Sequence, residues 1–117
     1  SASQNNFSLV IRFVYGEDSF LFTGDIERQG EYAILGQNLE LASDILKVAH
    51  HGSKTSSSEL FLERVNPAIV VISAGRSNPY GHPHGAILQR LEEYGIKVRR
   101  TDTEGDVLIV SNGNSFQ

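Results

Sequence analysis

The run AIVVIS (Ala68–Ser73) constrains the fold most, because continuous β-branched apolar residues are typical of a strand covered on both faces. A second apolar run, DILKVA (Asp44–Ala49), predicts another strand earlier in the chain. Helices are expected over residues 57–65 and about 85–94, ended by Asn66-Pro67 and by Gly95. This strand–helix alternation predicts an α/β fold, a sheet with helices packed on it.

The other elements have shorter patterns. Residues 8–16 alternate apolar side chains on one face and predict a half-buried strand, joined by a turn to a hairpin partner at 19–23. A short helix is expected over residues 26–35, and strands over 96–100 and 106–110. Ser56 stands three residues before Glu59, a capping-box spacing at the start of the 57–65 helix. We expect one domain, 1–117, with residues 1–5 as a disordered or cloning-derived tail.

Composition excludes several kinds of site. The net charge of −4 and the scattered basic residues argue against a basic face that binds nucleic acid through its phosphates. The absence of cysteine excludes disulfides and thiolate metal sites. If the chain handles phosphodiesters, something other than its bulk charge must hold them.

All four histidines lie in two loops that follow apolar strands: His50 and His51 in HHGS, and His82 and His84 in GHPH. The turn Thr23-Gly24-Asp25 also follows a strand. Side chains beyond the carboxyl ends of strands gather at one edge of an α/β sheet. Imidazole and carboxylate suit Zn, Mn or Fe, although each feature alone is more often a loop or cap residue. The residues therefore indicate a metal or phosphate site without naming a reaction.

Four stretches in order, TGD, LKVAHHGSKTSS, NPYGHPH and RTDTEGDVLIV, resemble the metallo-β-lactamase-fold domain that ends the ComEC family of DNA-uptake competence proteins. The resemblance covers about residues 6–110. It implies half of an αββα sandwich, with a mixed sheet and helices packed on it. The HxHxDH motif of that fold is absent, as is the histidine motif that precedes the TGD aspartate. The resemblance therefore implies the C-terminal portion of the domain.

The same resemblance implies roles for individual residues. Asp25 resembles the acidic ligand that bridges two metals, and His82 resembles the last histidine ligand. His50 and His51 are the catalytic candidates, with His51 favoured over His50 as a general acid or phosphate contact. The candidates for binding phosphate or substrate are Lys54, Thr55, Ser56 and His84. For Ser56 the alternative is capping, and for His84 it is orienting His82 or beginning the helix.

The implied function is the C-terminal part of a two-metal phosphodiesterase or nuclease in a bacterial membrane protein, cutting the DNA strand that is not imported. The whole domain would bind two divalent ions, Zn or Mn, and this chain alone would bind metal weakly or not at all and be inactive. Implied partners are single- or double-stranded DNA, the N-terminal half of the domain and the membrane channel, with no small-molecule cofactor. The implied location is a soluble domain on the outer face of the cell membrane. The alternatives are another phosphodiester, such as a wall or lipid headgroup, or a non-catalytic appendage of the channel.

Overall fold

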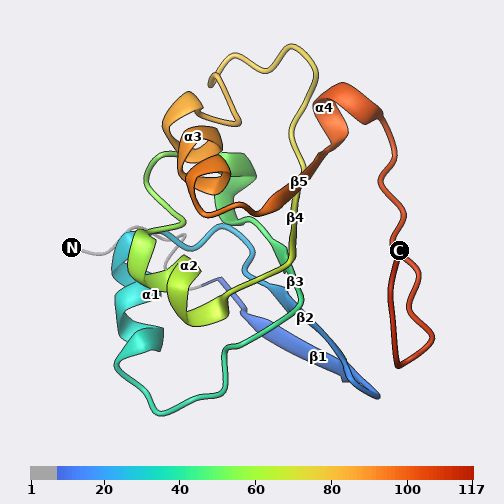
Figure 1. Cartoon of the computed structure of the whole chain (residues 1–117). Helices are drawn as coiled ribbons and strands as arrows, with labels where there is room; N and C mark the ends of the chain where they lie inside the picture. Colours follow the sequence, from blue (N-terminus) through green and yellow to red (C-terminus); the bar gives the residue numbers. More distant parts are fainter. Residues whose placement is uncertain (1–7) are drawn as a thin grey trace.

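The structure, a computed structural model, describes residues 8–117 as one sheet with helices packed on it (Figure 1). The expectation for residues 1–5 lies outside the described residues. In sheet order, the strands are β1 Ile11–Tyr15, β2 Asp18–Phe22, β3 Ile45–Lys47, β4 Ile69–Ile72 and β5 Lys97–Arg100. The helices are α1 Arg28–Leu35, α2 Glu59–Val65, α3 Gly85–Glu93 and α4 Thr101–Glu104, with a 3₁₀ turn, η2, at Ala49–Gly52.

The sheet is mixed, as predicted. Strands β1 and β2 form an antiparallel hairpin, whereas β2, β3, β4 and β5 run parallel to one another. In register, Phe20 of β2 lies opposite Ile45 of β3, which lies opposite Ile69 of β4. Because the parallel strands point the same way, the segments that follow them meet at one edge of the sheet. The α/β class expected from the sequence is confirmed.

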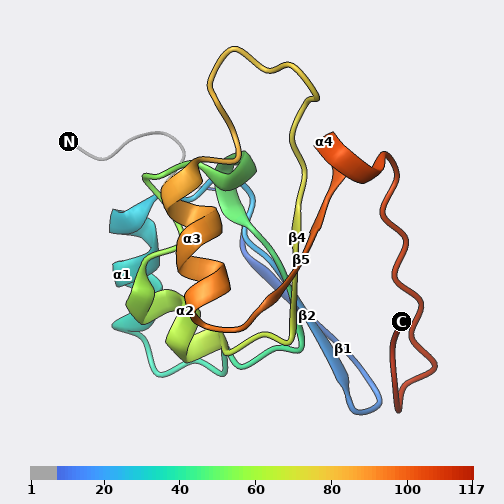
Figure 2. The same ribbon diagram turned by 45° about the horizontal axis from the view of Figure 1, so that its top comes forward.

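Helices α1, α2 and α3 cover one face of the sheet (Figures 1 and 2). Residues that alternate along the strands point to that face, since successive side chains of a strand point to opposite sides. The core they form with the helices is almost completely buried, and its members include Leu21, Ile26, Leu46, Val48, Phe61, Leu62, Val65, Val70, Ile72, Ile87 and Leu91. Burying this apolar surface is the main stabilising contribution to the fold.

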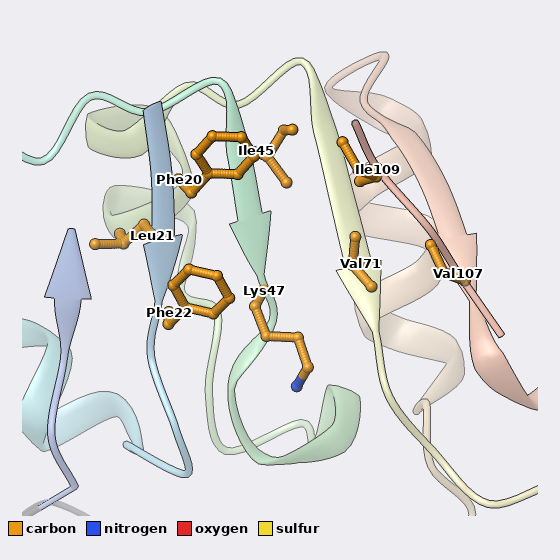
Figure 3. Close-up of a pocket in the computed structure, with 8 residues that line it drawn as sticks. All are labelled: Phe20, Leu21, Phe22, Ile45, Lys47, Val71, Val107 and Ile109. Carbon is orange, nitrogen blue, oxygen red and sulfur yellow. The ribbon is translucent and has the colours of Figure 1, made fainter. Parts of the chain in front are cut away.

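The opposite face, which we call the open face, carries apolar side chains that no helix of residues 8–117 covers. Phe20, Phe22, Ile45 and Val71 line it beside Lys47, and Val107 and Ile109 close one side of a cavity of about 240 Å³ (Figure 3). Phe22 is 48% exposed. The expectation that β4 is covered on both faces was therefore wrong. Val70 and Ile72 are fully buried, but Ile69 and Val71 are only half-buried.

Strand β1 was expected to bury one of its two faces, and this was also wrong. Ile11, Phe13 and Tyr15, the face predicted to be buried, are about half exposed at 48%, 55% and 52%. The reason is its position: β1 is the edge strand, and the hairpin that it forms with β2 projects beyond the helices (Figure 1).

Residues 106–110 do not form the predicted strand. Val107 and Ile109 face the sheet while Leu108 and Val110 are exposed, so the alternation is present. Val110 exchanges backbone hydrogen bonds with Gln117 instead of pairing with β5. Alternation predicts which side chains share a face but does not supply a hydrogen-bonding partner.

Within residues 8–117, no helix has both the length and the apolar character needed to cross a membrane.

Candidate metal centre

The TGD turn follows β2 and is tied to the end of β3. Thr23 is fully buried, and its Oγ1 donates to the carbonyl of Lys47 at 2.7 Å. Gly24 has a left-handed φ of +55°, and its carbonyl accepts from the backbone N–H of His50 at 3.0 Å. These bonds place Asp25 beside the histidine pair, with 46% of its side chain exposed.

Most of the HHGS segment lies in η2, which ends at Gly52, and His50 and His51 within it both have left-handed backbones, at φ 52° and 56°. Two consecutive non-glycine residues in this region cost of order 1–3 kcal/mol each. Gly52 is also left-handed, and a Cβ added to it would lie 2.6 Å from Cβ of Pro83. Its carbonyl accepts from the backbone N–H of His84 at 2.8 Å. The two histidine loops therefore pack directly on each other, and the strained backbone aims both rings at the sheet edge.

The His51 ring is held between a carbonyl and a carboxylate. Its Nδ1 lies 2.7 Å from the carbonyl oxygen of Ser73, and its Nε2 lies 3.9 Å from Oδ1 of Asp25. A carbonyl only accepts, so this contact places a proton on Nδ1; in the neutral form of His51 the Nε2 lone pair then faces Asp25. A separation of 3.9 Å is too long for a hydrogen bond. Two ligands about 2.1 Å from one tetrahedral metal lie roughly 3.4 Å apart, so this pair is close to the spacing of metal ligands.

His82 lies close to both histidines of η2. Its ring centroid is 5.6 Å from that of His50 and 6.4 Å from that of His51. Burial, followed by the neighbouring imidazoles of His50, His51 and His84, lowers the pKa of His82 below its ordinary value. Neutral imidazole is the form that binds metals.

His50 gives a second indication that an ion binds at this place. Its Nδ1 is buried and has no hydrogen-bond partner among residues 8–117. A buried polar atom without a partner is costly and calls for an explanation. A bound ion near His50, His51 and His82 would explain it.

These residues fit part of a metal site. Within the described part of the chain, no group of three or more His, Asp, Glu or Cys residues is arranged to hold a metal ion. Asp25 and His51 lie 3.9 Å apart, and the ring centroids of His50 and His82 each lie 6.4 Å from that of His51. These side chains are therefore candidate ligands of a metal centre.

Of the remaining site candidates, the structure leaves some exposed to solvent and buries another. Lys54 and Thr55 are exposed, so binding phosphate stays a prediction for them. Ser56 is fully buried, and its hydroxyl donates to the carbonyl of Ile26 at 2.5 Å, so it neither faces solvent nor caps the helix. The cap of α2 is Ser58, whose Oγ accepts from the Phe61 N–H at 3.3 Å. Capping depends on where the backbone turns, which the serine-rich sequence left ambiguous.

His84 is the N-cap of α3, and its Nδ1 accepts from the Ala86 N–H at 3.1 Å. This geometry matches the alternative in which His84 begins the helix. Contact with substrate stays a prediction.

Sequence reasoning missed the residues that hold the site in place. Oγ1 of Thr101 accepts from the Ala74 N–H at 2.9 Å and donates to the Ala74 carbonyl at 3.1 Å. It thereby fixes the end of β4 next to Ser73, whose carbonyl orients His51. Thr101 belongs to the RTD motif, in which Arg100 and Asp102 form an ion pair at 2.7 Å. The motif was visible, but its contact across two strands could not be read from spacing.

Glu31 was missed as well. This α1 carboxylate is fully buried and accepts from the backbone N–H groups of Ser57, at 2.5 Å, and Ser58, at 2.9 Å. Burial raises the pKa of Glu31, and the bonds from Ser58 and Ser57 oppose that rise. Glu31 therefore anchors the segment that connects η2 to α2. A single acidic residue inside a helix gave no sequence signal for this role.

A mixed sheet with helices on one face and an aspartate–histidine set beyond its parallel strands is consistent with part of a metallo-β-lactamase fold. Consistent with this, residues 3–76 match the metallo-beta-lactamase superfamily, and the chain belongs to that superfamily.

Among curated proteins, the chain is 43% identical to ComE operon protein 3 of Bacillus subtilis over 91% of its length, and 43% identical to competence protein ComA of Neisseria gonorrhoeae over 86%. It is 41% identical to recombination protein 2 of Haemophilus influenzae over 98% of its length. The resemblance to the competence family inferred from the motifs is confirmed. The chain spans only 14–15% of these relatives.

The incomplete ligand set predicts weak metal binding by this chain alone. Asp25 and His51 leave most positions of an ion to water, whereas closed zinc sites use four protein ligands. Calorimetric titration with Zn²⁺ or Mn²⁺ should show a weak site that Asp25→Ala removes. A tight stoichiometric site would show that the chain holds more ligands than the geometry indicates.

Proposed function

We propose that this chain is the C-terminal part of a metal-dependent phosphodiesterase domain that acts on DNA in a bacterial DNA-uptake protein. The observation that carries the proposal is the orientation of His51, whose Nδ1 lies 2.7 Å from a backbone carbonyl while Nε2 faces Asp25. Metal-binding histidines almost always donate their other ring N–H to a carbonyl, carboxylate or water. The likeness to competence protein ComA supports the setting in DNA uptake.

In this proposal Asp25 and His51 hold one divalent ion, and His82 and His50 complete the chain's share of the ligands. Divalent ions supply polarisation of the phosphate and a lowered pKa of bound water. They also supply the positive charge that a chain of net charge −4 lacks.

The chain's own residues hold and orient the substrate. The exposed Lys54 and Thr55 follow η2 and can contact phosphate oxygens. The Ser73 carbonyl keeps the proton on Nδ1 of His51, so Nε2 remains a ligand atom. This assigns His51 to metal binding, in place of the general-acid role favoured from sequence.

The open face supports the other partners of the proposal. Phe20, Phe22, Ile45 and Val71 form an apolar surface of the kind that a second sheet covers in a sandwich. We assign that position to the N-terminal half of the same domain, which would bring the missing ligands. The membrane channel and a location on the outer face of the membrane belong to the same proposal.

The test uses a protein of the relatives' length that carries this chain, since the chain alone is expected to cleave DNA negligibly. Metal-dependent cleavage of an oligonucleotide should fall at least roughly 10–100-fold in Asp25→Ala, because even outer-shell changes at metal sites cost that much. Asp106→Ala, an exposed aspartate outside the site, is the control and should cleave normally. Cleavage that survives Asp25→Ala would contradict the proposed site. No cleavage by the unaltered protein would favour the non-catalytic appendage.

A further inference from the structure

A row of rings leads from the exposed loop between β4 and α3 to His51 of η2 at the candidate metal centre. Tyr80 is 77% exposed, and its ring stacks on His82 with centroids 5.8 Å apart and planes 29° apart. His82 in turn stacks on His51, at 6.4 Å and 21°. We call Tyr80, His82 and His51 the aromatic column. Its inner end is the ring that faces Asp25.

A cavity of about 200 Å³ lies along the column, lined by His51, Tyr80 and His82 together with Ala74, Gly75 and Asn78. Three of these lining residues carry rings and two are small, so a flat group can lie against the rings. Such a group would lie directly beside the pair Asp25 and His51.

The loop is held in shape before any ligand binds. The Asn78 amide donates to the carbonyls of Gly75, at 2.9 Å, and His82, at 2.6 Å, and it accepts from the His82 N–H at 2.9 Å. These three bonds join the two ends of the segment that contains Tyr80. A site preorganised in this way loses less conformational entropy on binding. Tyr80 takes no part in these three bonds, so its exposed ring can contact a ligand without breaking them.

We propose that the aromatic column is a stacking platform for a nucleobase of single-stranded DNA, positioned so that the neighbouring phosphate lies over Asp25 and His51. This inference rests on the proposed function and names the form of its substrate. Aromatic side chains bind single strands by stacking, which does not depend on base sequence. Bases in a duplex are stacked on each other and cannot enter. Arg76, exposed on the same loop, provides a cation for the backbone.

Stacking also suits the charge of the chain. With a net charge of −4, the chain cannot hold DNA by general electrostatic attraction. Stacking on one base typically changes affinity by roughly 5- to 150-fold, which a metal–phosphate contact can supplement.

The chain contains no tryptophan, so the substitution Tyr80→Trp introduces a single fluorescent reporter in the column. Tyr32→Trp, at an exposed tyrosine of α1, is the matched control. Each variant is titrated with a short oligothymidylate and with an abasic oligonucleotide of the same length and charge. Saturable quenching of the Tyr80→Trp variant is expected with oligothymidylate, with at least roughly tenfold weaker binding of the abasic strand. The fluorescence of the Tyr32→Trp variant should be quenched by neither.

Equal effects of both oligonucleotides on the Tyr80→Trp variant, or no quenching, would overturn the platform. The result is independent of catalysis. Quenching of this variant, together with no phosphodiester cleavage by the protein of the relatives' length, would support the platform and reject the hydrolase. Metal-dependent cleavage by that longer protein, without quenching of this variant, would support the hydrolase and reject the platform.

Discussion

His51→Ala, in a protein of the relatives' length that carries this chain, is expected to reduce phosphodiester cleavage by at least roughly 10–100-fold, because it removes a proposed metal ligand and even outer-shell changes at metal sites cost that much. The side chain is 52% exposed, so the free energy of unfolding should change by only about 0.5 kcal/mol. Cleavage rate, bound metal and melting temperature are measured together. Metal content should fall together with the rate, because His51 is proposed as a ligand. A rate that falls while metal content stays unchanged would contradict that role and favour the general-acid role instead.

A double variant supplies the control. If Asp25 and His51 hold the same ion, Asp25→Ala combined with His51→Ala should lose little more activity than either change alone, because contacting residues act as a unit. If the two losses of activity are fully additive, Asp25 and His51 do not hold the same ion. If the His51→Ala protein is unfolded, while the His50→Ala protein is folded but inactive, the roles of the two histidines are the opposite of those proposed.

Glu31→Ala is expected to destabilise the fold by about 2–5 kcal/mol. The change leaves the N–H groups of Ser57 and Ser58 buried without an acceptor, and each unsatisfied donor costs about 1–3 kcal/mol. Urea unfolding measures the loss. Glu92→Ala, at an exposed position of α3, should alter stability by no more than about 0.5 kcal/mol. Equal effects of the two changes would contradict the anchoring role of Glu31.

The same residue predicts a pH dependence. The pKa of Glu31 is raised above its ordinary value by burial, so the folded state favours the protonated carboxyl more than the unfolded state does. Its contribution is therefore fully present below the unfolded pKa and is lost as the pH rises through the folded pKa. The stability of the unaltered chain relative to Glu31→Gln should decrease as the pH rises from acidic to neutral. A stability difference between the two proteins that stays constant or increases with pH would contradict a raised pKa of Glu31.

The five strands of the sheet and helices α1, α2 and α3 could be predicted because they depend on local patterns, whereas α4 and η2 were not predicted. The β-branched run of β4 and the glycine after α3 mark their elements directly. The burial of β1 and the pairing of residues 106–110 could not be predicted, since both depend on which segments lie alongside. Alternation in Ile11–Tyr15 is the same whether or not a layer covers it.

The site was predictable in its residue types but not in its arrangement. The concentration of histidines in two loops and the TGD turn brought Asp25, His51 and His82 into consideration. The left-handed backbones of His50 and His51 decide which ring faces Asp25, and no sequence pattern encodes them. Ser73, Thr101 and Glu31 act through backbone contacts with residues far away in sequence, which spacing cannot reveal.

The most direct test of the candidate metal centre is Mn²⁺-induced broadening in the NMR spectrum of this chain, which detects weak binding and locates it. At low Mn²⁺ ratios, the signals of Asp25, His51 and His82 should broaden first, and Asp25→Ala should abolish this pattern. Broadening centred on another acidic segment, such as the exposed residues of α4, and unchanged in Asp25→Ala would contradict the account.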